Sequence, residues 1–95
     1  MPACVGVLTI QLCIIDAMTL KDKRQVVRSL LDRISHRFNV SVAEVGRLDN
    51  PRRAEIAFAA VSNDGGHVME QLQTVLQVVL SEPRSLVEDS DIELL

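Results

Sequence analysis

Large apolar residues occupy every second position near the start of the chain, within residues 5–15 (VGVLTIQLCII). The alternating aliphatic residues are Leu8, Ile10, Leu12 and Ile14. The positions between them hold smaller or polar side chains, namely Val7, Thr9, Gln11 and Cys13. A period of two residues is typical of a β-strand whose two faces differ. We therefore predict a strand here, with its aliphatic face in the core.

Apolar residues then recur at helical spacing over residues 20–37, at Val26, Val27, Leu30, Leu31 and Ile34. At about 100° per residue these side chains fall within one stripe, which is typical of a helix that packs one side on a core. Thr19 suits the N-cap position. Asp22, three residues later, completes a shortened form of the capping box. The pattern predicts a helix over residues 20–37.

Two more strands are predicted, over residues 39–47 and 52–62, with a turn signal between them at residues 48–51 (LDNP). Gly46 predicts a bend or bulge near the end of the first of these strands. In the second, alternation puts Ile56, Phe58 and Ala60 on one face and Glu55, Ala57, Ala59 and Val61 on the other.

A second amphipathic helix is predicted over residues 66–81, after a turn and cap at residues 63–66 (NDGG). Pro83 prevents its continuation. Residues 85–95 then contain an acidic final strand. The order β-α-β-β-α-β predicts one ferredoxin-like α+β domain over residues 1–95, with a four-stranded antiparallel sheet and both helices on one face.

Composition limits the class of protein. Hydrophobic residues make up 47% of the chain, which excludes a disordered chain. The apolar runs are too short and too interrupted to cross a bilayer, and no basic segment precedes the first of them, as a signal peptide would require. We expect a soluble, cytoplasmic protein with no membrane partner.

Charge is divided unevenly along a chain whose net charge is -3. Residues 21–53 hold nine of the ten cations and four acids, whereas residues 54–95 hold eight acids and one cation, Arg84. Three cations, Lys21, Lys23 and Arg24, cluster at the start of the first helix, where the helix dipole disfavours them, and Arg28 follows one turn later. An anion such as RNA phosphate would explain this cluster, with Arg52 and Arg53 as secondary contacts. The alternative is a solvated helix flank, with internal pairs such as Arg28–Asp32.

The helix-free face of the predicted sheet is the second candidate surface. Its inner strands offer small, mostly apolar side chains, and we predict a homodimer interface there: Val7, Thr9, Gln11, Cys13, Ala57, Ala59 and Val61. The alternative is a half-polar, wet face. The chain has only two aromatic residues, Phe38 and Phe58. Because RNA-recognition domains of this topology stack bases on aromatic side chains of the inner strands, we do not expect RNA on the sheet.

Catalytic chemistry has no recognisable set of residues. Cys4 and Cys13 are expected on opposite faces of one strand, so they are predicted to be free thiols. Neither has a Cys or His at metal-ligand spacing, and neither His67 nor His36 is paired in the sequence with a nucleophile. We expect no enzyme activity, no metal and no cofactor.

The chain resembles the YlxP-like family of small bacterial proteins over nearly its whole length. The resemblance is carried by VGVLTIQLCI at residues 5–14, LKDKR at 20–24 with Val27, Leu30 and Arg33, FNVSVAEV at 38–45, VSND at 61–64 and IELL at 92–95. That family is ferredoxin-like, and its genes often lie among translation and ribosome-maturation genes, which implies a link to RNA or the ribosome. Members commonly have a Trp near residues 48–53, where this chain has LDNPRR.

The residues and the resemblance together predict a non-enzymatic module that binds structured RNA or a ribosomal subunit through the basic helix flank. The alternative is a homodimeric protein-interaction or assembly module with no nucleic-acid role.

Overall fold

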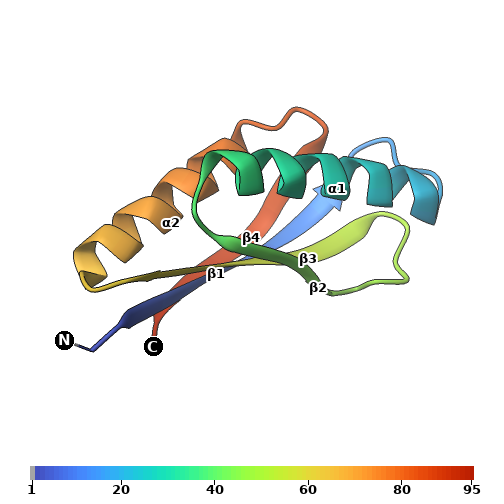
Figure 1. The fold of residues 1–95 in the computed structure, drawn as a ribbon. Coiled ribbons are helices and arrows are strands. Elements are labelled where there is room, and N and C mark those ends of the chain that lie inside the picture. Colours follow the sequence, from blue (N-terminus) through green and yellow to red (C-terminus); the bar gives the residue numbers. More distant parts are fainter. Residues whose placement is uncertain (1) are drawn as a thin grey trace.

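Residues 2–95 are described by the structure, a computed structural model, and they form one sheet and two helices. The elements in chain order are β1 (Cys4–Ile14), α1 (Leu20–Arg37), β2 (Ser41–Gly46), β3 (Arg53–Ser62), α2 (Gly65–Leu80) and β4 (Ser85–Leu94). The strands are antiparallel, in the order β2-β3-β1-β4. Both helices lie on the same side of the sheet (Figure 1). The ferredoxin-like α+β prediction is confirmed.

The core lies between the helices and the aliphatic face of the sheet. On β1, Leu8, Ile10 and Leu12 are fully buried, and Leu8 pairs in register with Phe58 of β3 and with Ile92 of β4. Both helices contribute one buried stripe, formed by Val27, Leu30 and Ile34 of α1 and by Val68, Leu72, Val75 and Val79 of α2. Burying each of these side chains contributes about 1.5–3 kcal/mol. The alternation on β1 and β3 therefore decides which face of the sheet the helices cover.

Side-chain caps define both helix starts; α1 begins at Leu20 as predicted, and α2 begins at Gly65, one residue earlier than predicted. The Asp22 backbone N–H donates to Thr19 Oγ1 over 3.1 Å, and the Thr19 N–H donates back to Asp22 Oδ2 over 3.1 Å. The hydrogen bond from the Met18 N–H to Asp22 Oδ2, more than any other cause, lowers the pKa of the Asp22 carboxyl, and Thr19 adds to this effect. At α2, Asp64 Oδ1 accepts from the Gly66 N–H over 2.9 Å. Both caps satisfy N–H groups that the first turn leaves free.

Two glycines sit where the chain needs a small residue or a break in register. Gly46 lies at a bulge, where the pairing of β2 with β3 shifts between Glu44 and Gly46, as predicted. Gly6 of β1 lies under α2, and a Cβ built there would be 2.6 Å from Val68 Cγ1. The α2 helix therefore packs so closely on β1 that a larger residue at position 6 would force neighbouring side chains such as Val68 and Leu72 to shift.

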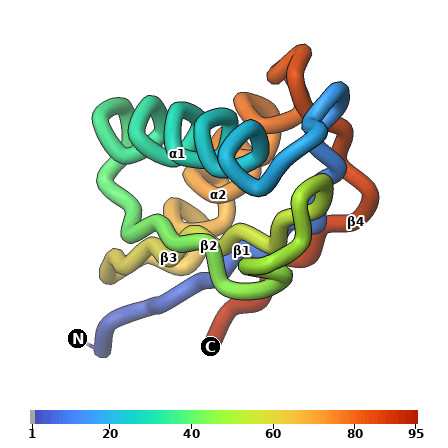
Figure 2. The backbone as a smooth tube through the Cα atoms, turned by 90° about the vertical axis from the view of Figure 1, so that its right-hand side faces the viewer, coloured from blue at the N-terminus to red at the C-terminus, as the bar shows by residue number. Residues whose placement is uncertain are grey.

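The two ends of the molecule differ. The chain termini lie side by side at one end, where the Leu95 N–H donates to the Val5 carbonyl over 2.8 Å (Figure 1). The start of α1 and the β2–β3 hairpin lie together at the opposite end, which faces the viewer in Figure 2. Within residues 2–95, no helix is both long enough and apolar enough to cross a membrane.

Candidate functional site

Most of the predicted basic cluster lies at the end of the molecule formed by α1 and the β2–β3 hairpin. Lys21, Arg24 and Arg28 are exposed on α1, and Arg52 is exposed in the hairpin. The structure adds Arg47, which is exposed at the end of β2 in a left-handed backbone conformation (φ 56°). Figure 2 shows the hairpin passing under the first turns of α1. We call these five residues the basic surface.

Lys23 is not part of that surface, and its predicted role as a phosphate contact is wrong. Its side chain is completely buried (0% exposed). Its Nζ lies 2.8 Å from Glu44 Oε2, 2.9 Å from the Arg47 carbonyl oxygen and 3.2 Å from the Arg53 carbonyl oxygen. A fourth oxygen, the Leu48 carbonyl, lies 3.5 Å away. Every proton of the ammonium group is thus used inside the protein.

The buried position of Lys23 follows from its place on the helix. It precedes Val27 by four residues, so it continues the buried stripe of Val27, Leu30 and Ile34 toward the N-terminus of α1. Its long apolar stem crosses the edge of the core and delivers the ammonium group to the hairpin. Lys23 therefore ties α1 to the β2–β3 hairpin and fixes the position of Arg47 and Arg52 relative to the helix.

Arg53 is also placed differently from its prediction. It pairs in register with Cys13, on the helix-free face of the sheet. Its Nε and Nη2 donate to Glu88 Oε1 and Oε2 over 3.0 and 3.2 Å, and this bidentate pair raises the pKa of the Arg53 guanidinium. Arg53 therefore faces away from α1 and does not join Lys21 and Arg24.

The five cations of the basic surface have no ion-pair partner among residues 2–95. The ion pairs in this part of the chain are Lys23–Glu44, Arg33–Glu82, Arg53–Glu88 and Arg84–Glu82. The possible Arg28–Asp32 pair is not formed, since no such contact occurs within the described residues. The acidic second half of the chain thus neutralises Arg33, Arg53 and Arg84 but leaves the basic surface unpaired.

A groove of about 250 Å³ separates α1 from β2 beside this surface. Arg24 and Arg28 line it from the helix, and Val42 lines it from the strand. Two carboxylates, Glu44 and Asp32, also line the groove. Glu44 forms an ion pair with Lys23, so Asp32 is the groove carboxylate without an ion pair among residues 2–95. The groove can hold an anionic group that contacts the two guanidinium groups and stays clear of Asp32.

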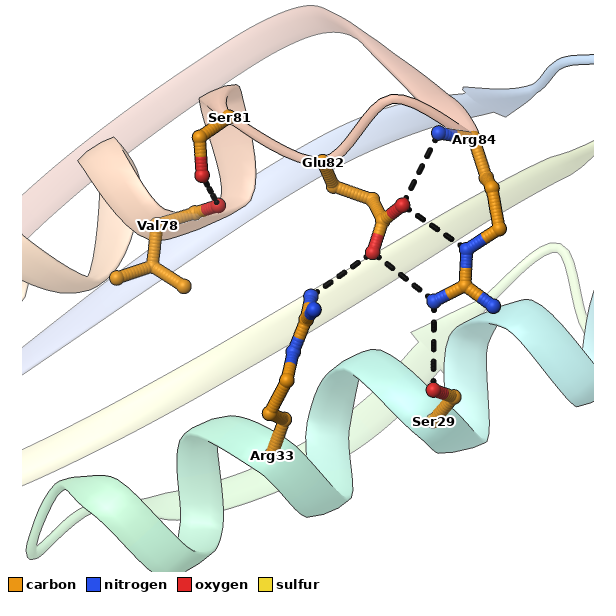
Figure 3. A network of polar contacts seen from close by, with 6 residues as sticks. All are labelled: Ser29, Arg33, Val78, Ser81, Glu82 and Arg84. Carbon is orange, nitrogen blue, oxygen red and sulfur yellow. Dashed lines mark hydrogen bonds and ion pairs between the residues drawn. The ribbon is translucent and has the colours of Figure 1, made fainter.

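A second charged network, shown in Figure 3, joins α1 to the loop between α2 and β4. The Glu82 side chain is 1% exposed, and its carboxylate accepts from Arg84 Nε over 2.9 Å and from Arg33 Nη2 over 2.8 Å. Arg84 Nη2 also donates to Ser29 Oγ over 3.3 Å. The hydrogen bonds from Arg84, more than any other cause, lower the pKa of Glu82 to about 2.

This network gives Glu82 a structural role. A carboxylate that is ionised at neutral pH and already accepts four hydrogen bonds is not a general base. No local sequence pattern predicts this network, because Arg33 and Glu82 are far apart along the chain.

The helix-free face of the sheet carries the residues predicted for a homodimer interface. Those on β1 are Val7, Thr9, Gln11 and Cys13, and those on β3 are Ala57, Ala59 and Val61. Phe58 points to the opposite side and is completely buried, so this face offers no aromatic side chain for a base. The shared, uncovered face is as predicted, and homodimerisation itself stays a prediction.

Residues 2–95 contain no group of three His, Cys, Asp or Glu side chains placed to hold a metal ion. Cys4 and Cys13 are free thiols, and each is partly buried. The arrangement of this domain therefore offers a cationic surface and an open sheet face.

Comparison with known proteins places the chain in a family context. Residues 5–92 match the family described as "Protein of unknown function (DUF503)". The chain is also 42% identical over 72 residues to a protein of Bacillus subtilis (strain 168) named "Uncharacterized protein YlxP". That match covers 75% of this chain and 78% of the Bacillus protein.

Proposed function

The chain belongs to the DUF503 family, as its residues 5–92 show, and we propose that it is a non-enzymatic, cytoplasmic module that binds structured RNA or a ribosomal particle. The basic surface makes the contacts. The observation that carries this proposal is that five exposed cations from two separate segments lie at one end of an acidic protein without internal partners in residues 2–95.

Electrostatics support phosphate as the group bound. Lys21 and Arg24 stand in the first turns of α1, where the positive end of the helix dipole repels cations and attracts anions. A phosphate placed there would reverse an unfavourable arrangement, and the release of counterions from the nucleic acid would add to its affinity. The electrostatic environment of Lys21 and Arg24 would thus be more favourable with RNA bound than without it.

The hairpin supports recognition of a folded RNA. Asn50 Oδ1 accepts from the N–H groups of Arg52 and Arg53 over 2.9 and 2.8 Å, and Lys23 binds the carbonyl groups on both sides of the turn. Arg47 and Arg52 therefore project from a fixed backbone. A rigid set of cations on a helix and a hairpin matches phosphates in a fixed arrangement, so recognition would depend on shape and charge rather than on base identity.

Fluorescence anisotropy of a labelled structured RNA, measured at several salt concentrations, tests this proposal. We expect a log–log slope of affinity against salt of about -3.5 to -4.5 for phosphate contacts by the five cations of the basic surface. Arg28→Glu should weaken binding strongly. Arg37→Glu is the matched control, because it makes the same charge change at an exposed position on the other flank of α1. Equal effects of the two variants, or no binding at low salt, would contradict the proposal.

The uncovered sheet face favours a second candidate, a homodimeric assembly module without a nucleic-acid role. It rests on the small apolar side chains of Val7, Ala57 and Ala59, which no helix of residues 2–95 covers. Sedimentation equilibrium at micromolar concentration tests this candidate, because a monomer would exclude it, whereas the RNA-binding proposal is compatible with a monomer or a dimer.

A further inference from the structure

We propose that the helix-free face of the sheet binds a basic amphipathic helix of a partner protein. This surface lies away from the basic surface and does not depend on RNA binding. The proposal rests on an apolar hollow over β2, β3 and β1, on a row of carboxylates along β4 beside it, and on a buried acceptor between two of the acidic positions.

The apolar part of the face is a shallow hollow of about 140 Å³. It is lined mainly by Val7, Ala43, Ala57 and Ala59. Both helices of the domain lie on the other side of the sheet (Figure 1). Small side chains at the centre of a sheet leave room for the larger apolar side chains of a helix to pack against them.

The acidic part of the face follows the edge strand β4. Glu93, Asp91 and Asp89 pair in register with Val7, Thr9 and Gln11, so their side chains share the open face with these residues. All three carboxylates are exposed, and none forms an ion pair within residues 2–95. One side of the apolar hollow is therefore bounded by an unneutralised negative row.

The buried acceptor belongs to Gln11, which lies in register between Glu55 on β3 and Asp89 on β4. Its Nε2 donates to Glu55 Oε2 over 2.8 Å. Its Oε1 is buried and has no hydrogen-bond partner among residues 2–95. A buried acceptor without a donor is costly. A Lys or Arg side chain arriving above this row, with a small rotation of the amide, would supply the missing donor.

The spacing of the acids matches a helix. Alternate residues on a strand lie about 6.6 Å apart, whereas residues four apart on a helix lie about 6 Å apart. Cations at positions i, i+4 and i+8 of a partner helix would therefore follow Asp89, Asp91 and Glu93. A helix about 10–12 Å wide, lying along β3 and β1, also reaches β4, because neighbouring strands are about 4.8 Å apart.

Charge distinguishes this partner from the other possible occupants. A second copy of the face would bring its own Asp89, Asp91 and Glu93, while Arg53, a cation on this face, is already paired with Glu88. Like charges placed together in an interface cost several kcal/mol. Nucleic acid would be repelled for the same reason. A basic helix neutralises the row and also fills the apolar hollow.

The test uses a synthetic 18-residue helical peptide with Lys at i, i+4 and i+8 and with Leu and Ala on the adjacent side. Its binding is measured by fluorescence anisotropy at low salt, and the contacts are mapped by NMR shifts of backbone amides. A scrambled peptide of the same composition controls for charge alone. We expect shifts on β1, β3 and β4 and tighter binding of the amphipathic peptide.

Neutralising the row (Asp89→Asn, Asp91→Asn, Glu93→Gln) should weaken binding about 3- to 150-fold, the range expected from three exposed ion pairs. The control variant neutralises three exposed acids off this face (Asp32→Asn, Asp49→Asn, Glu70→Gln) and should bind as the wild type does. Equal binding of the scrambled peptide, equal effects of the two triple variants, or a homodimer that occupies this face would overturn the proposal. None of these outcomes would affect the separate proposal that the basic surface binds RNA.

Discussion

Lys23 provides the sharpest test of how the basic surface is built. Replacing it by Met (Lys23→Met) keeps most of the buried apolar volume and removes the ammonium group. The Glu44 carboxylate then loses its cation, and the carbonyl groups of Arg47 and Arg53 lose their donor. We expect a large loss of stability, because the unpaired groups stay at a site that the folded chain shields from water.

The magnitude follows from the contacts. Breaking a buried ion pair by removing one partner costs about 3–5 kcal/mol. Here the Lys23 side chain is 0% exposed but the Glu44 side chain is 17% exposed, so water can reach part of the remaining carboxylate. The lower end, about 3 kcal/mol, is therefore expected. For a domain of this size, 1 kcal/mol corresponds to about 4–8 °C in Tm, which gives a decrease of about 12–24 °C.

Urea denaturation followed by circular dichroism measures this change. The control is Lys21→Met, because Lys21 is exposed two residues away on the same helix and should change the free energy of unfolding by less than about 0.5 kcal/mol. A second variant, Lys23→Met with Glu44→Leu, removes both charges and should recover part of the loss, since a buried pair can be replaced by apolar residues.

Two results would refute this reasoning. A loss below about 1 kcal/mol for Lys23→Met would mean that the hairpin carbonyl groups do not depend on the ammonium group. A strong loss of RNA affinity at unchanged stability would return Lys23 to the phosphate-binding role that its burial excludes. By contrast, weaker RNA binding together with lower stability would fit a residue that positions the hairpin.

Two other predictions follow from the packing and the charges. Gly6→Ala should lower the free energy of unfolding by about 1–3 kcal/mol in urea denaturation, because the new Cβ would lie 2.6 Å from Val68 Cγ1, whereas Gly65→Ala, with 3.8 Å to its nearest neighbour, should be tolerated. Glu82, whose pKa of about 2 in the folded state lies below its ordinary 4.5, should stabilise the fold fully above pH 4.5 and progressively less as the pH falls toward 2. In the Glu82→Gln variant, the free energy of unfolding measured across that pH range should no longer show this part of the pH dependence. A profile equal to that of the wild type would contradict the role assigned to Glu82.

Local patterns were enough to predict most of the fold. Helix α1 spans residues 20–37 in both prediction and structure, because the Thr19 cap and the apolar stripe each act within a few residues of the chain. The faces of β1 were also predicted correctly, since alternation on a strand needs no knowledge of its neighbours.

The contacts of the charged residues could not be predicted in this way, because their partners come from distant segments of the chain. The sequence shows that Lys23 continues the stripe of Val27 and Ile34, but only the register of β2 and β3 reveals the oxygens that make its burial possible. The pairing of Arg53 with Glu88 likewise depends on β1 lying between β3 and β4. Helix and strand periods determine which side a residue faces, whereas ion pairs depend on which segments are neighbours.

The order of the strands in the sheet also determines when the sheet can be completed. Among the strands of residues 2–95, β1 is synthesised first and β4 last, yet β1 lies inside the sheet between β3 and β4. While translation proceeds, β1 therefore has one free edge until the acidic segment Ser85–Leu94 leaves the ribosome. Pairing of such distant segments is slow because a long loop must close first. A chain that stalls before β4 would expose an aliphatic central strand, so rapid completion of synthesis protects this domain against aggregation.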